Sequence, residues 1–265
     1  MKVKDFLEHF LSRADWINRE HTVDRVIAGD AEADVDRCLV TWMPSFAHVR
    51  EAVKQGVKLL VAHEPTFYCH HDDRPEIHPP EYKIVQEKLA FIKGSGLNIV
   101  RLHDTWDRWP AIGIPSAWGQ FLQLGDKPVA FGADNYLHRH DIAPTTLGAF
   151  AAHVANRCAT IGEPRVQVTG DLQQTVSKIG VGTGCGCDIN TYRSMGCDCS
   201  VVCDDGSCYW AGIQMARDDG HPVIRVNHGT SEEPGMVTLT RYINENLPVK
   251  AQHLPHGCMF ELVGA

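Results

Sequence analysis

The sequence feature that most constrains the fold is a short apolar run, residues 59–62, which ends directly on His63 and Glu64. Strands that are buried on both faces of a sheet appear in a sequence as uninterrupted apolar runs of this kind. A strand pattern at residues 37–42 and an amphipathic helix pattern at residues 46–55 precede the run. This order predicts a right-handed β-α-β unit with parallel strands.

The chain repeats this arrangement twice more. Two later apolar runs each end on a histidine that is followed four positions later by a carboxylate: His103 with Asp107, and His228 with Glu232. Ligand sites in open α/β sheets lie beyond the carboxyl ends of the strands, so we expect these side chains at one sheet edge. One turn of helix would place both members of each later pair on the same helical face.

The three clusters supply candidate ligands for one or two divalent metal ions. The candidate ligands are His63, Glu64, His103, Asp107, His228 and Glu232. Imidazoles and carboxylates suit zinc, iron or manganese. Two such ions about 3.5–4 Å apart can share a bridging hydroxide that is nucleophilic at neutral pH. This interpretation predicts hydrolysis of a phosphoester, nucleotide-like or cyclic C–N substrate, with Glu232 and His103 as candidate catalytic groups that handle protons.

Each cluster also has a simpler interpretation. A single histidine at the end of a strand is more often a hydrogen-bonding group than a metal ligand. Pairs of histidine and carboxylate at i, i+4 are also common on solvated helix surfaces. Three clusters that each follow a buried-strand pattern are harder to explain in this way. Three functions stay open: a metal-dependent hydrolase with a small-molecule substrate, a non-enzymatic metal-binding, trafficking or adaptor protein, and a ring scaffold whose cleft binds a ligand without chemistry.

Composition excludes several other classes of protein. Of 265 residues, 43% are hydrophobic and 22% are charged, which is typical of a soluble globular protein. The formal net charge of -8 argues against a nucleic-acid-binding surface, which would need a basic stripe. No apolar stretch is long enough for a membrane-spanning helix, and the first residues do not resemble a secretory signal. We therefore expect a cytoplasmic protein without a membrane partner.

Strand and helix patterns alternate in both halves of the chain. We expect an α/β fold with two lobes, residues 1–125 and 126–265, and a metal site in the cleft between them. In the second half the pattern predicts a strand at 129–136, a helix that opens at 141–146 and extends to about 158, a helix that begins near Pro234, and a closing strand at 259–263.

Six of the ten cysteines lie between Cys185 and Cys208. In a cytoplasmic protein they are more readily thiols or metal ligands than disulfides. A structural zinc or iron–sulfur site and a set of small buried or active-site thiols are both open interpretations. Cys185 and Cys187 follow a predicted strand, as the candidate ligands do. Other polar groups near predicted strand ends are Asp204 and Asp205, which could orient a ligand, and the histidines His70, His71 and His78 in a long polar loop.

At the histidine and carboxylate motifs the sequence resembles the GTP cyclohydrolase type 2 homologues, also called the NIF-three-like family. The family motifs are His-His-Pro, His-Thr-Asn-x-Asp and His-x-x-x-Glu. Here they appear as His63-Glu64-Pro65, as residues 103–107 and as residues 228–232. Their order and separation fit along nearly the whole chain, in the form without an inserted middle domain. The resemblance implies a two-lobed α/β fold, a dinuclear metal centre and a toroidal homohexamer.

The resemblance also assigns roles to individual positions. His63 and Asp107 would hold one ion, Glu64 and His228 would hold the second, and Glu232 would bridge the two. His103 would contact an ion or one of its ligands. Glu64 departs from the family pattern, because the family has histidine there. A carboxylate at this position is a harder ligand, which favours iron, manganese or magnesium or weakens the second site.

Overall fold

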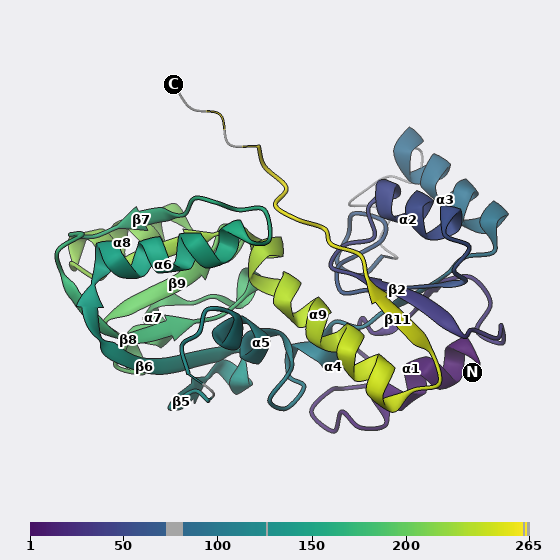
Figure 1. The fold of residues 1–265 in the computed structure, drawn as a ribbon, viewed down its shortest axis with the longest axis horizontal. Coiled ribbons are helices and arrows are strands. Elements are labelled where there is room, and N and C mark those ends of the chain that lie inside the picture. Colours follow the sequence, from purple (N-terminus) through teal and green to yellow (C-terminus); the bar gives the residue numbers. More distant parts are fainter. Residues whose placement is uncertain (73–81, 126, 262, 264–265) are drawn as a thin grey trace. The chain divides into compact units, whose positions relative to one another are not determined.

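The computed structural model describes residues 1–72, 82–125, 127–261 and 263. The chain divides into two compact units, each of which contains one sheet and its helices (Figure 1). Unit 1 comprises Met1–Trp109 and Met236–His256, and unit 2 comprises Pro110–Gly235 and Gly257–Ala265. This grouping differs from the predicted halves because a strand near the C-terminus pairs with the sheet of unit 1.

Unit 1 contains a sheet with the strand order β1-β4-β3-β2-β11. The strands β11, β2, β3 and β4 run parallel, whereas β1 pairs with β4 in the antiparallel direction. In sheet order, the strands are β1 (Arg25–Ala28), β4 (Asn98–Arg101), β3 (Leu59–Ala62), β2 (Arg37–Thr41) and β11 (Lys250–His253). The helices of this unit are α1 (Val3–Leu11), α2 (Phe46–Lys54), α3 (Lys83–Ser95), α4 (Asp104–Asp107) and the later part of α9 (His228–Asn246).

The predicted β-α-β unit is confirmed as β2, α2 and β3, with parallel strands. One face of this sheet packs against α2 and α3. Leu39, Leu60 and Ile99 lie beside one another on β2, β3 and β4, and they form a buried cluster with Val49 of α2 and Ile92 of α3. Burying each of these side chains contributes about 1.5–3 kcal/mol.

The predicted closing strand at 259–263 is wrong, because no strand is found in its described residues, and the last strand is β11 instead. Met259 and Phe260 are largely exposed. The segment Lys250–His253 has no apolar run, and only its pairing with β2 makes it a strand. An edge strand that is half exposed needs little apolar sequence, which explains why the pattern did not reveal it.

Unit 2 contains a six-stranded sheet with the order β5-β6-β8-β9-β10-β7. Strands β8, β9 and β10 run parallel and the other pairs are antiparallel. In sheet order, the strands are β5 (Ala130–Gly132), β6 (Leu137–Thr146), β8 (Thr175–Val181), β9 (Cys199–Cys203), β10 (Val223–Val226) and β7 (Gln167–Thr169). The helical elements are η1 (Ala133–Asn135), η2 (Gly184–Gly186), η3 (Tyr209–Gln214), α5 (Ile114–Phe121), α6 (Leu147–Ala159), α7 (Ile189–Ser194), α8 (Met215–Asp218) and the start of α9.

Two helix starts in the second half differ from the prediction. Residues 141–146 belong to strand β6, and α6 begins only at Leu147, where the Thr146 hydroxyl accepts a hydrogen bond from the Ala149 amide at 3.2 Å. Helix α9 begins at His228, with Pro234 inside it, rather than near Pro234. The one turn of helix expected for His228 and Glu232 is therefore the first turn of this same helix.

In both sheets, the last residues of two neighbouring parallel strands pair with each other. Ala62 of β3 pairs with Arg101 of β4, so the residues that follow both strands leave the sheet of unit 1 at the same edge. In unit 2, Cys203 of β9 pairs with Val226 of β10 in the same way. In unit 1 the candidate ligands therefore follow two strand ends that lie side by side, and in unit 2 Asp204 and Asp205 follow β9 beside the end of β10, which His228 follows.

In the part of the chain that the structure describes, no helix has both the length and the apolar composition needed to cross a membrane.

Candidate functional site

In unit 1, the imidazole of His63 is held in one orientation. The side chain is fully buried, and its Nδ1 lies 3.1 Å from the carbonyl oxygen of Leu102. A carbonyl oxygen can only accept a hydrogen bond, so Nδ1 carries a proton and, in the neutral ring, Nε2 presents its lone pair. That Nε2 atom lies 3.3 Å from Oδ1 of Asp107. This arrangement is typical of a metal-ligating histidine, which donates its other N–H to a carbonyl or a carboxylate.

His103 and Asp107 are positioned by a short helix whose N-terminus is capped by a buried carboxylate. The side chain of Asp24, 3% exposed, accepts hydrogen bonds from the backbone amides of His103, Asp104 and Thr105 at 2.6, 2.9 and 2.8 Å. These amides begin α4, where the helix itself provides no acceptors. The His103 ring stacks on the His63 ring with centroids 4.5 Å apart, and its Nδ1 lies 3.4 Å from Oδ2 of Asp107.

The carboxylates around His103 control its charge. Burial alone would lower the pKa of His103, but the nearby Asp107, Asp104 and Glu64 carboxylates outweigh that effect and raise the pKa to about 10. Burial similarly tends to raise the pKa of Asp104, but its contacts with His103 and Thr22 hold the pKa well below the usual value. The neighbouring carboxylates therefore favour the protonated form of the His103 ring.

Glu64 lies beside a buried guanidinium. Arg101, whose side chain is 1% exposed, places Nη2 3.8 Å from Oε2 of Glu64 and donates from Nε to the His63 carbonyl at 2.8 Å. The guanidinium also donates to the carbonyl of His70. Ligand atoms of His63, Glu64 and His103 all lie within 4.8 Å of one another, so these three side chains could hold a cation.

In unit 2, the two candidate ligands lie on one turn of α9. Nε2 of His228 is 3.0 Å from Oε2 of Glu232, four residues later, and Nδ1 of His228 is 3.2 Å from Oδ2 of Asp205. Gly184 packs closely against this pair: a Cβ atom there would lie 2.7 Å from His228 Nε2 and 2.9 Å from Glu232 Oε1. The predicted i, i+4 geometry is therefore present, and the turn beside it excludes any side chain at position 184.

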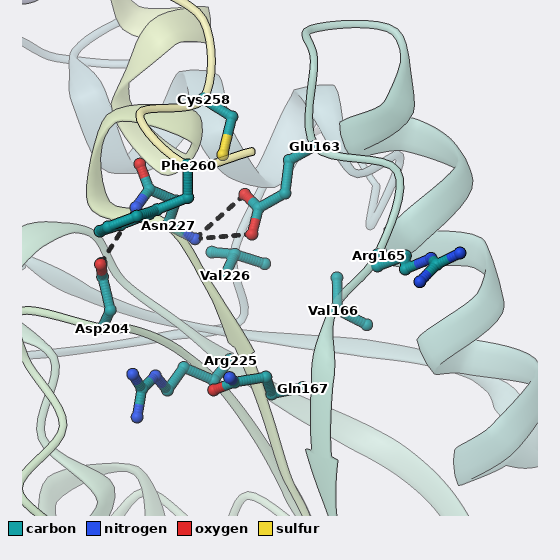
Figure 2. A pocket seen from close by; sticks show the side chains of 10 residues that line it. All are labelled: Glu163, Arg165, Val166, Gln167, Asp204, Arg225, Val226, Asn227, Cys258 and Phe260. Atoms are coloured by element: carbon teal, nitrogen blue, oxygen red, sulfur yellow. Dashed lines mark hydrogen bonds between the residues drawn. The ribbon is translucent and has the colours of Figure 1, made fainter. Parts of the chain in front are cut away.

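Two carboxylates hold the backbone that leads into α9 (Figure 2). Asp204 accepts from the His228 amide at 2.7 Å and from Asn227 Nδ2 at 3.0 Å. Both carboxylate oxygens of Glu163 lie 3.0 Å from the Asn227 amide nitrogen. Burial raises the pKa of Glu163, although its hydrogen bonds to Thr230 and Asn227 oppose the shift. Glu163, Asp204 and Asn227 line a cavity of about 340 Å³, and Asn227 directly precedes His228 in the sequence.

Of the six side chains predicted as ligands, four belong to unit 1 and two belong to unit 2. His63, Glu64, His103 and Asp107 lie together in unit 1, and His228 and Glu232 lie together in unit 2. The suggested contacts of Asp204 and Asp205 with a ligand are present at His228. The carbonyls of His70 and His71 accept from Arg101 and Arg25 respectively, and His78 lies outside the described residues.

Comparison with known proteins identifies the family of a chain with this fold and these ligands. A sequence model of the DUF34/NIF3 family, described as NGG1p interacting factor 3, matches residues 1–257. The chain belongs to the DUF34/NIF3 family. A protein named GTP cyclohydrolase 1 type 2 homolog from Clostridium perfringens (strain 13 / Type A) is 20% identical over 257 residues, which cover 93% of each chain.

Solved structures of similar proteins show the same fold. The Staphylococcus aureus protein SA1388 has a TM-score of 0.80 and 16% identity, and the alignment covers 99% of each chain. A Bacillus cereus protein described as related to NIF3 has a TM-score of 0.73 and 16% identity, with 100% of this chain and 99% of that chain covered. Reduced HcgD from Methanocaldococcus jannaschii has a TM-score of 0.70 and 16% identity, with 96% and 98% covered. These likenesses confirm the predicted α/β fold of this NIF3-family chain.

Sequence reasoning missed three supporting residues of this DUF34/NIF3 protein. Asp24 caps α4 from a segment 79 residues earlier in the chain than His103, and Glu163 holds Asn227 across 64 residues. Arg101 lies in a run whose pattern predicts a buried strand. The presence of a charged residue in that run was the only sequence signal for its role. A buried arginine needs an acceptor, and its position directly before the second histidine motif pointed to the same site.

Proposed function

We propose that this NIF3-family protein binds divalent metal ions through His63, Glu64, His103, Asp107, His228 and Glu232, and uses them to hydrolyse a nucleotide-like, phosphoester or cyclic C–N substrate. One observation, made separately in each unit, supports the metal site. An anchored imidazole presents its second nitrogen to a carboxylate oxygen: His63 to Asp107 at 3.3 Å, and His228 to Glu232 at 3.0 Å.

The donor set fits a cation on chemical grounds. When Nδ1 of His63 donates to the Leu102 carbonyl, Nε2 of the neutral ring and the Asp107 carboxylate are both electron-pair donors. Two donors that face each other at this distance repel unless a proton or a cation lies between them. Mixed imidazole and carboxylate sites suit zinc, iron or manganese. The family resemblance assigns His63, Glu64, Asp107, His228 and Glu232 to one dinuclear centre, with Glu232 as the bridge. It gives His103 contact with an ion or with one of its ligands, and the proposal keeps these assignments.

The residues of the chain have distinct roles in this proposal. Two divalent cations, when bound, supply Lewis acidity and lower the pKa of a water molecule that attacks the substrate. Asp24 and Asp204 hold the backbone at His103 and His228, so that the ligands keep their positions without rearranging. His103, next to Asp104 and Asp107, can deliver a proton to a leaving group when it contacts a ligand rather than an ion, and the Glu232 carboxylate can accept a proton from the attacking water.

Metal analysis of the purified protein tests the first half of the proposal. We expect up to two equivalents of zinc, iron or manganese per chain. We also expect a loss of at least one equivalent in each of the variants His63→Asn and Glu232→Gln. Glu51→Gln is a matched control, because Glu51 also lies on a helix and bonds a side chain four residues away, Gln55. Equal metal content in Glu232→Gln and Glu51→Gln would contradict the role of Glu232.

Turnover by the metal-loaded protein tests the second half. The name of the Clostridium perfringens relative makes GTP the first probe. A nitrophenyl phosphate ester and a cyclic amide extend the test to the other two bond types. We expect hydrolysis of at least one probe, and loss of that activity in His103→Gln. Bound metal without any turnover would instead support the second function, a metal-binding or trafficking protein. The homohexamer and the cytoplasmic location stay predictions.

A further inference from the structure

We propose that Cys187 and Cys203 in unit 2 form an oxidisable dithiol, a modification site that a peroxide converts to a disulfide. The two Sγ atoms lie 3.8 Å apart, and both side chains are buried, with 5% and 0% exposure. A disulfide bond is about 2.05 Å long, so the sulfurs need to approach by less than about 2 Å. Cys203 lies at the end of β9 and Cys187 directly follows the short turn η2.

A structural metal site explains this pair less well than a disulfide does. Tetrahedral zinc in a structural site needs four ligands, usually cysteine and histidine. Among the described residues, no group of three or more candidate ligands that lie close together includes a cysteine. Two thiols in contact without further ligands are instead arranged for bond formation with each other. This assigns a chemistry to part of the cysteine cluster that the sequence singled out.

The turn before Cys187 gives a small oxidant a route to the pair. Cys185 in that turn is exposed, and Gly184 and Gly186 flank it. Gly184 has a φ of +56°, a conformation that glycine adopts without strain. Local opening of a short glycine-containing turn costs far less than unfolding of the unit, so Cys187 can reach solvent while Cys203 stays on its strand.

The reaction balances with a peroxide as the oxidant. The Cys187 thiol loses its proton and the thiolate attacks one oxygen of hydrogen peroxide; the O–O bond breaks, sulfenic acid forms, and the departing hydroxide takes up a proton to give one water. The Cys203 thiol then loses its proton and the thiolate attacks the sulfenic sulfur; the S–O bond breaks, the disulfide forms, and the departing hydroxide takes up a proton to give a second water. Two thiols lose two electrons and two protons, and peroxide takes up both. An external dithiol reverses the reaction by thiol–disulfide exchange.

Oxidation would alter the neighbouring ligand pair through hydrogen bonds. The Cys203 thiol donates to Ser231 Oγ at 3.0 Å, and the Ser231 hydroxyl donates to the His228 carbonyl at 2.7 Å. A disulfide has no S–H, so the hydrogen bond from Cys203 to Ser231 is lost. The approach of Cys187 toward Cys203 also pulls on the turn whose Gly184 packs against His228 and Glu232. We therefore expect weaker metal binding in the oxidised protein, and this consequence rests on the proposed function.

Peptide mapping of the full-length protein tests the dithiol itself. The reduced, metal-free protein is treated with one equivalent of hydrogen peroxide, the excess is destroyed with catalase, and remaining thiols are alkylated before digestion and mass spectrometry. We expect a peptide pair joined between Cys187 and Cys203, with the loss of two hydrogens, which a dithiol reductant separates. Separate alkylation of both cysteines, or a link between Cys185 and Cys187 only, would overturn the proposal.

Metal titration of the same samples tests the coupling. We expect at least tenfold weaker binding of manganese or zinc by the oxidised wild type than by the reduced wild type, and restoration by the reductant. Cys187→Ser should bind metal equally before and after peroxide, whereas Cys38→Ser, which changes a buried cysteine of unit 1, should respond like the wild type. Unchanged affinity after a confirmed disulfide would overturn the coupling. If the reduced protein binds no metal, the proposed function fails, and peptide mapping still decides the dithiol.

Discussion

The two units position their candidate ligands in different ways. In unit 1, His63 follows β3, and His103 and Asp107 follow β4, so pairing between two strands brings them together. In unit 2, His228 and Glu232 lie on a single turn of α9. The first group therefore depends on long-range pairing and the second on local helix geometry. Disturbing the sheet edge should therefore separate the ligands of unit 1, whereas the spacing of His228 and Glu232 depends on one turn of α9.

The charges around the two groups also differ. The ligands of unit 1 lie beside the buried guanidinium of Arg101. The pair in unit 2 is surrounded by carboxylates: Asp205 contacts the His228 ring and Asp204 holds its backbone. A cation entering unit 1 meets positive charge that partly offsets its ligands, and one entering unit 2 does not. We infer that the two groups contribute differently to the affinity and the metal preference of the proposed centre.

The largest expected effect comes from Asp24→Ala. This substitution leaves three amides of α4 without their acceptor, and each unsatisfied buried donor costs about 1–3 kcal/mol. We expect local destabilisation of at least about 3 kcal/mol around α4. Hydrogen exchange should show fast exchange of the amides of residues 103–105, with unit 2 unchanged. Protection of these amides equal to wild type would show that α4 holds His103 without Asp24.

Asp205→Ala should weaken metal binding by unit 2 about tenfold or more. The side chain contacts Nδ1 of His228, and removing the group that orients a ligating histidine typically costs 10–100-fold in affinity. Asp218→Ala, which changes another exposed carboxylate of unit 2, is the matched control. Metal titration by calorimetry measures both. Identical titrations for the two variants would show that Asp205 does not orient the ring.

Glu64→His should shift metal preference toward zinc by about tenfold, with less effect on total affinity. An imidazole is a softer ligand than a carboxylate, and it restores the histidine that the family resemblance expects here. Competition between zinc and manganese measures the shift. Glu64→Gln provides the control, because it removes the charge beside Arg101 without supplying a nitrogen ligand. If both variants shift the preference equally, the charge rather than the ligand type decides it.

The smallest effect is confined to acid and to unit 2. Burial, together with the neighbouring His140, lowers the pKa of His138 to about 4. Its usual value of about 6.5 applies in the unfolded chain, so the unfolded chain gains a proton first as the pH falls. Stability is therefore present above pH 6.5 and is lost as the pH falls toward 4. In unfolding measurements, the free energy of unfolding of His138→Gln should fall less than that of the wild type as the pH falls from 6.5 toward 4. Above pH 7 the two proteins should show the same pH dependence.

Much of the fold was accessible from local patterns. The run that ends at Ala62 and the helix Phe46–Lys54 have the apolar spacing of their elements, and Ser45 caps the helix by accepting from the His48 amide. Strand β11 and the long strand β6 were missed, because their residues become strand only through partners in the sheet. Propensity is weak in edge strands and in polar strands, and pairing there overrides it.

The sequence alone determined which side chains could carry the chemistry. A histidine at a strand end and a carboxylate four residues after a histidine are local features, so His63, His103 and His228 could be selected without a structure. Only tertiary structure decided what orients them. Asp24, Arg101 and Glu163 act across tens of residues, and the contact between Cys187 and Cys203 joins two separate elements. A linear pattern records what each residue can do, but hydrogen bonds and buried charges depend on distances that only folding sets.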